Sequence, residues 1–170
     1  RNWVITGRER HVARAREGLL PYPQRALRTA DFLYIINFAP DRWPMGNPYN
    51  ITADSAPNFK TLENNTFVTY GDLDASPTKA WLIERRNDEK WEWHYDYAFA
   101  KRPREELYVL ADDPDQVNNV AGDENFTAIK AKLNRQLMGR LKKARDPRVL
   151  GDGSTFDKPP YINTQAKRRK

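Results

Sequence analysis

The fold class is decided by one stretch of the chain, Arg25-Ala26-Leu27-Arg28-Thr29-Ala30-Asp31-Phe32-Leu33-Tyr34-Ile35-Ile36-Asn37-Phe38. Its second half is rich in β-branched and aromatic residues, which favour a pleated, half-buried surface. The short polar segment at 29–31 suits the tight turn of a hairpin. The stretch therefore predicts two antiparallel strands, over residues 22–28 and 31–38.

Two further segments have strand character, residues 2–7 and residues 106–110. Asp123 can then cap a helix over about 124–143, and Pro147 follows its end. One apolar stripe at helical spacing runs along this segment: Phe126, Ile129, Leu133, Leu137 and Leu141. The pattern predicts an α+β fold, with a small antiparallel sheet covered by the long C-terminal helix.

The middle of the chain carries weaker signals. Residues 40–71 contain four prolines and show neither helical nor strand periodicity, so we expect a long irregular loop. Ser76 and Pro77 are a favourable cap and first position for a helix. In residues 91–99 the aromatics alternate as on a strand but also recur at i+4, and Pro103 beyond them favours a helix. We therefore expect a second helical stretch near 77–99.

Composition limits the possible functions. The 170 residues suffice for one real core, and no run of apolar residues is long enough to span a membrane. The net charge is +6, but the tail Lys167-Arg168-Arg169-Lys170 contributes +4 of it, which leaves +2 for the rest. So weak a field gives little reason to expect nucleic-acid binding. The absence of cysteine rules out disulfides, thiolate metal sites and a cysteine nucleophile within this chain.

The best local candidate for chemistry is the cluster Arg8-Glu9-Arg10-His11. Guanidinium groups bind oxyanions bidentately, and histidine can donate a hydrogen bond or carry a proton near neutral pH. The alternative interpretation is a solvated strand end with a salt bridge. The acidic pairs Asp72/Asp74 and Asp112/Asp113 complete no calcium loop, and turn chemistry explains them better.

Several motifs, in the same order along the chain, carry a family resemblance. Residues 22–35 resemble the hairpin that opens the C-terminal subdomain of sulfatases. Residues 103–121, with Glu105-Glu106-Leu107-Tyr108-Val109-Leu110 and Asp113-Pro114-Asp115-Gln116, resemble a late segment of the same family. Residues 7–11 and 71–79 are similar to the bacterial sulfatases related to heparan N-sulfatase (N-sulfoglucosamine sulfohydrolase). The resemblance covers about residues 1–150, and residues 151–170 form a polar extension with a basic tail.

The resemblance implies an alkaline-phosphatase-like parent enzyme that hydrolyses sulfate esters or sulfamates of glycosaminoglycan-like sugars. In the family the nucleophile is a formylglycine, made from Cys or Ser in a C/S-x-P-x-R motif, and a calcium ion is bound nearby. Both lie in an N-terminal part, which would be the main partner of this chain. Ser55 and Pro57 have the spacing of that motif, but Phe59 stands where it needs arginine, so Ser55 is not assigned as nucleophile. This chain alone is expected to be inactive.

What the chain can contribute is substrate binding at the rim of the pocket. The resemblance places Glu9, Arg10 and His11 in that role, and Arg42, in Asp41-Arg42-Trp43, is a further candidate. The expected substrate is a sulfated sugar, and the family suggests export to the periplasm or exterior. The alternative is a stand-alone carbohydrate-binding or interaction module, which the five tryptophans suggest. A nucleic-acid-binding domain is a further alternative, suggested only by the basic isoelectric point and the basic tail.

Overall fold

The computed structural model describes residues 2–161, in two compact units that are each built from separate segments of the chain. Unit 1 comprises residues 2–9, 22–40 and 103–160, and unit 2 comprises residues 10–21, 41–102 and 161. The expected division of the chain at residue 150 stays a prediction, and the basic tail 167–170 lies outside the described residues. No described helix is long and apolar enough to cross a membrane.

Unit 1 contains a four-stranded antiparallel sheet in the order β1-β2-β3-β4. The strands are β1 (Trp3–Arg8), β2 (Gln24–Thr29), β3 (Phe32–Asn37) and β4 (Glu105–Val109), close to the expected bounds. The β2–β3 hairpin turns where the sequence predicts it, and the Thr29 hydroxyl accepts a hydrogen bond from the Phe32 amide at 3.0 Å. The α+β class and the small antiparallel sheet are therefore confirmed.

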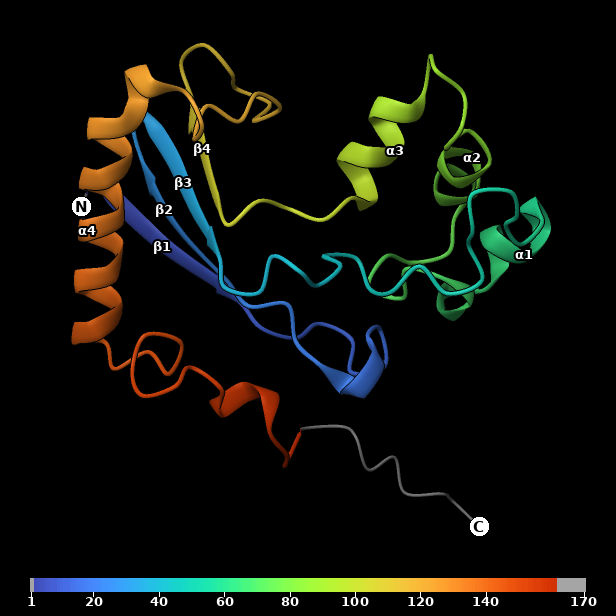
Figure 1. Cartoon of the computed structure of the whole chain (residues 1–170), viewed down its shortest axis with the longest axis horizontal. Coiled ribbons are helices and arrows are strands. Elements are labelled where there is room, and N and C mark those ends of the chain that lie inside the picture. The colour runs from blue at the N-terminus through green and yellow to red at the C-terminus, as the bar shows by residue number, and fades with distance from the viewer. Residues whose placement is uncertain (1, 162–170) are drawn as a thin grey trace. The chain divides into compact units, whose positions relative to one another are not determined.

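One row of apolar side chains crosses all four strands on one face of this sheet. Ile5 is paired with Leu27, Leu27 with Tyr34, and Tyr34 with Leu107. This row packs into a single core with three buried leucines of helix α4 (Thr127–Lys143): Leu133, Leu137 and Leu141. Figure 1 shows α4 running along the sheet. The predicted covering helix is thus confirmed: the apolar stripe of the helix and the apolar row of the sheet bury each other.

The ends of α4 follow the capping signals in the sequence. Asp123 accepts a hydrogen bond from the Asn125 amide at 2.8 Å and begins a single 3-10 turn, η3 (Glu124–Phe126), which leads into α4. At the other end Arg140, Lys142 and Lys143 lie in the last turn, where positive charge interacts favourably with the helix dipole.

Unit 2 is helical, with α1 (Phe59–Asn64), α2 (Pro77–Glu84) and α3 (Glu92–Phe99), and the short 3-10 turns η1 (Glu17–Leu19) and η2 (Thr66–Val68). Its core consists of Leu62, Tyr70, Ala80, Ile83 and Phe99. The expected helical stretch near 77–99 is confirmed as two helices separated by a turn. Ser76 caps α2 by accepting from the Lys79 amide at 3.1 Å, as its position predicted.

The expectation that residues 40–71 are irregular throughout is wrong. Helix α1 lies within them, capped by Asn58, whose side chain accepts from the Thr61 amide at 2.9 Å. The helix has six residues and buries only Leu62, so it contains too few turns to leave a periodic apolar pattern.

Lys79 and Gly46 lie where separate segments of unit 2 meet. The buried Lys79 ammonium donates to the carbonyl oxygens of Thr66, Tyr70 and Leu73 at 3.1, 3.2 and 2.7 Å. Gly46 has φ +93°, and a Cβ there would lie 2.7 Å from the Ala15 carbonyl oxygen. Only glycine adopts this conformation at so close an approach.

Candidate functional site

Glu9 lies at the end of β1, where its carboxylate joins two buried arginines. Arg25 donates from Nη2 to Glu9 Oε1 at 2.7 Å, and Arg148 donates from Nη2 to Glu9 Oε2 at 2.6 Å. The side chain of Glu9 is 19% exposed, while those of Arg25 and Arg148 are 8% and 5% exposed. Residues 9 and 148 are far apart in sequence, so this network connects the beginning and the end of unit 1.

Two further carboxylates complete the network. Arg25 binds Asp146 bidentately, at 2.6 and 3.1 Å, and Arg148 reaches Asp157 at 2.8 Å. Burial lowers the pKa of Arg25, but its bonds to Asp146 and Glu9 outweigh burial and raise that pKa above its usual value. For Asp146 the directions are reversed. Burial raises the pKa of this carboxyl, but the hydrogen bonds from Arg25 and from the Arg148 amide outweigh burial, so the pKa is lowered. The charges therefore stabilise one another.

The neighbouring residues Arg10 and His11 belong to unit 2. The guanidinium of Arg10 donates to the Leu19 carbonyl and lies 4.0 Å from the centre of the Tyr161 ring. The side chain of His11 is 67% exposed, with Nδ1 3.7 Å from a carboxylate oxygen of Asp72. His11 can thus present its imidazole to solvent or to a ligand, with a carboxylate behind it.

Arg42 lines a cavity of about 250 Å³ in unit 2. Its Nη1 donates to the Pro21 carbonyl at 3.0 Å. The cavity walls combine two guanidiniums, two carboxylates, an amide and an indole, from Arg16, Arg42, Glu17, Asp41, Asn47 and Trp43, together with Leu20. Neither Arg10 nor His11 lines this cavity, and Glu9 belongs to unit 1. The expectation that all four residues contact substrate stays a prediction.

Two residues that line this cavity, Arg16 and Trp43, are joined through a buried ion pair that the sequence did not suggest. Arg16 donates to the carboxylate of Asp72 and to the carbonyl oxygens of Trp43 and Pro44, the latter two at 2.7 and 2.6 Å. Asp72 also accepts from the Val12 amide at 2.9 Å. Arg16 and Asp72 therefore fix the backbone that carries Trp43. The only signal in the sequence was the Asp72/Asp74 pair, which the turn interpretation explained without a partner.

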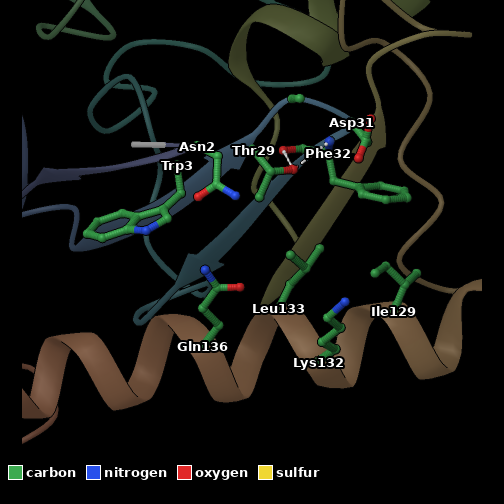
Figure 2. Close-up of a pocket in the computed structure, with 10 residues that line it drawn as sticks. Asn2, Trp3, Thr29, Asp31, Phe32, Ile129, Lys132, Leu133 and Gln136 are labelled. Atoms are coloured by element: carbon green, nitrogen blue, oxygen red, sulfur yellow. Dashed lines mark hydrogen bonds between the residues drawn. The ribbon is translucent and has the colours of Figure 1, made fainter.

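A second hollow, of about 280 Å³, lies in unit 1 between α4 and the β2–β3 turn. Figure 2 shows Lys132, Leu133 and Gln136 of α4 on one side and Trp3, Thr29 and Phe32 on the other. Its apolar walls, including Trp3, Phe32, Ile129 and Leu133, belong to the core of unit 1. Among the described residues that line it, Asp31 and Lys132 are the charged ones. We attribute this hollow to the edge of the core.

The described residues contain no group of three or more His, Asp or Glu side chains placed to hold a metal ion. Ser55 lies in a polar turn, with its hydroxyl 3.0 Å from that of Thr52. In comparisons with protein-family models and with curated proteins, no match to this chain is found. The Arg42 cavity offers the residue types that bind a polar, hydroxyl-rich and anionic ligand: guanidiniums for an anion, an indole for a ring face, and carboxylates for hydroxyl groups.

Proposed function

We propose that this chain is the C-terminal portion of a sulfatase that hydrolyses sulfate esters or sulfamates of glycosaminoglycan-like sugars. The observation that carries the proposal is the order of the resembling motifs and the elements they form. The first motif forms the β2–β3 hairpin, the late motif forms β4 beside β3, and the helix that follows covers the same sheet. Motifs that are distant in the sequence are thus adjacent in one sheet, as parts of one subdomain should be.

In this proposal the chain shapes the rim of the substrate pocket. Arg42 binds the anionic group of the sugar, Trp43 packs on the ring, and Arg10 and His11 supply donors at the edge. The Arg25–Glu9–Arg148 network holds the end of β1 within unit 1. We propose that Glu9 acts by fixing this end of the strand as well as through any contact with the sugar.

The formylglycine nucleophile and the calcium ion of the resembled family are assigned to the N-terminal part of the parent. The proposal likewise assigns to that N-terminal part the step that breaks the sulfur–oxygen or sulfur–nitrogen bond. Export to the periplasm or exterior, as the family suggests, is part of the proposal.

The test is sulfate release by the parent protein, this chain together with the part that precedes it, with calcium added. N-sulfoglucosamine and 6-O-sulfated N-acetylglucosamine are the two substrates, and ion chromatography measures the product. Release above blank, with a KM raised about tenfold or more by Arg42→Ala, is the expected result, since losing one charged hydrogen bond costs about that much. Arg85→Ala, which removes an exposed arginine paired with Asp88 at 3.5 Å, is the matched control. A parent that releases no sulfate from either sugar would contradict the proposal.

A second candidate function is a carbohydrate-binding or interaction module without catalysis. The observation that favours it is an exposed aromatic pair on α3: Trp93 and Tyr97 stack at 5.2 Å between ring centres and are 54% and 37% exposed. Flat aromatic pairs of this kind bind sugar rings and protein surfaces. Binding of heparin fragments by the isolated chain, lost in Trp93→Ala, would support this function over the first.

A further inference from the structure

Unit 2 contains another cavity, of about 380 Å³. None of the expected site residues Glu9, Arg10, His11 and Arg42 lines it, but Trp43, next to Arg42, does. It lies between the segment after Trp43, the turn between α2 and α3, and one side of α3. The lining residues used below are Trp43, Tyr70, Tyr95, Glu92, Asp96 and Asn87. Its volume falls within the range of small-ligand sites.

The aromatic wall of this cavity is held in place by the core. The ring of Tyr70 is stacked on Phe99, with centres 4.3 Å apart, and Trp43 meets Tyr70 edge-on at 6.2 Å. The hydroxyls of Tyr70 and Tyr95 are 2.6 Å apart. Because these rings are already fixed in the free protein, binding of a ligand against them costs little side-chain entropy.

The opposite part of the lining is acidic. Glu92 and Asp96 are one turn apart on α3, so their side chains share a face. Both are exposed, and within the part of the chain that the structure describes neither carboxylate takes part in a hydrogen bond or an ion pair. The nearby Arg86 directs its guanidinium to the carbonyl oxygens of Ile83, Thr52 and Ala53 instead.

Trp43 lines both this cavity and the Arg42 cavity. In the Arg42 cavity Arg16 is already paired with Asp72, which leaves the Arg42 guanidinium beside Glu17 and Asp41.

In the second cavity the Arg86 guanidinium binds backbone carbonyls, and the Lys101 ammonium lies 5.3 Å from the centre of the Trp43 ring. The two carboxylates on α3 disfavour a sulfate group beside them, since like charges repel.

We propose that this second cavity is a subsite for an unsulfated sugar ring, and that it prefers an amino sugar. The apolar face of the ring packs on Trp43 and Tyr95, its hydroxyls donate to Glu92 and Asp96, and Asn87 can accept or donate. A ring ammonium adds an attraction to the two carboxylates. The inference depends on the proposed function only for the idea that the ligand is a glycan, in which this ring neighbours the sulfated one.

The experiment titrates the full 170-residue chain, labelled with 15N at the tryptophan indoles, with glucosamine, glucose and N-sulfoglucosamine. We expect glucosamine and glucose to shift the Trp43 signal, with a Kd about threefold lower for glucosamine, the size expected for an exposed charge pair. N-sulfoglucosamine should bind this subsite more weakly than glucose. Glu92→Gln combined with Asp96→Asn should remove the advantage of glucosamine, and Glu89→Gln, which removes an exposed carboxylate outside the lining, should change neither Kd.

Variants separate the two cavities that share Trp43. The shift of the Trp43 signal with glucosamine should persist in Arg42→Ala and fall in Asp96→Asn. A Trp81 signal at the same position as in the unsubstituted chain reports that each variant is folded. Absence of any Trp43 shift with glucosamine and glucose would overturn the inference, as would a glucosamine advantage that survives the combined replacement of Glu92 and Asp96. If the parent releases sulfate but glucosamine does not bind, only the subsite fails. If glucosamine binds through Asp96 but the parent releases no sulfate, only the sulfatase proposal fails.

Discussion

Replacement of Glu9 by glutamine tests whether the first cluster seen in the sequence stabilises the fold. The network contains two guanidiniums and three carboxylates, a net charge of −1, and Glu9 is the carboxylate within it that contacts both arginine side chains. Glu9→Gln removes the charge but leaves each arginine one carboxylate, Asp146 or Asp157. The loss should therefore be smaller than the full cost of breaking a buried pair.

The magnitude follows from the bonds that are lost. A hydrogen bond between charged groups contributes about 1.5–3 kcal/mol, and Glu9 takes part in such bonds with two arginines. The amide oxygen of glutamine can still accept from one of them. We therefore expect Glu9→Gln to lower the free energy of unfolding of unit 1 by about 2 kcal/mol. Asp88→Asn, which breaks the exposed pair with Arg85, should cost less than about 1 kcal/mol.

The assay is urea unfolding of the chain, labelled with fluorotryptophan and followed by 19F NMR. Trp3 is the one tryptophan in unit 1, so its signal reports on the network's own unit. With an m value of about 2–3 kcal/mol/M, a loss of about 2 kcal/mol moves the Trp3 midpoint down by about 0.7–1 M. An unchanged Trp3 midpoint, combined with weaker binding of N-sulfoglucosamine, would refute this reasoning and make Glu9 a substrate ligand.

Three further predictions concern buried groups. Burial lowers the pKa of Lys79 to about 8, so the unfolded chain binds more protons than the folded one above that pH. The free energy of unfolding should thus rise by at most about 2.7 kcal/mol from pH 8 to pH 10, and pH-dependent urea unfolding should show no such rise in Lys79→Met. The lowered pKa of Asp146 gives stability above roughly pH 4 that is lost in acid, so thermal unfolding at falling pH should be less steep in Asp146→Asn. Gly46→Ala should lower the melting temperature through its positive φ and its approach to the Ala15 carbonyl, whereas Gly122→Ala, with open space around its Cβ, should not.

The parts of the fold that the sequence predicts are those in which neighbours along the chain supply the pattern. The β2–β3 hairpin and the stripe of α4 each depend on residues a few positions apart, so propensity and periodicity reveal them. Helix α1 is too short for such a pattern. The sequence does not predict that each unit is built from separate segments of the chain, because that division depends on contacts between residues far apart in sequence.

The candidate site divides in the same way. The segment Asp41-Arg42-Trp43 could be selected because residue types alone suggest a sugar rim. Its companions Arg16 and Glu17 come from a segment with no periodic signal, and only the fold brings them to the same cavity. Glu92 and Asp96 stand at i and i+4 in the sequence, but the aromatic residues between them are as typical of a packed helix as of a binding site.

The arginines of this chain show why a charged motif does not by itself identify a binding site. Arg16, Arg25 and Arg148 are buried and donate to carboxylates and carbonyls, so removing any one takes a charged partner away from a carboxylate with little access to water. Arg42 is half-buried and faces a cavity, where a ligand can take the place of water. Substitution of the first three should therefore reduce stability first and binding as a consequence, whereas substitution of Arg42 should reduce binding at nearly unchanged stability. Parallel measurement of urea midpoints and sugar affinity for Arg16→Met and Arg42→Met separates the two roles, and a stability loss in Arg42→Met as large as that in Arg16→Met would assign Arg42 to the fold rather than to the rim.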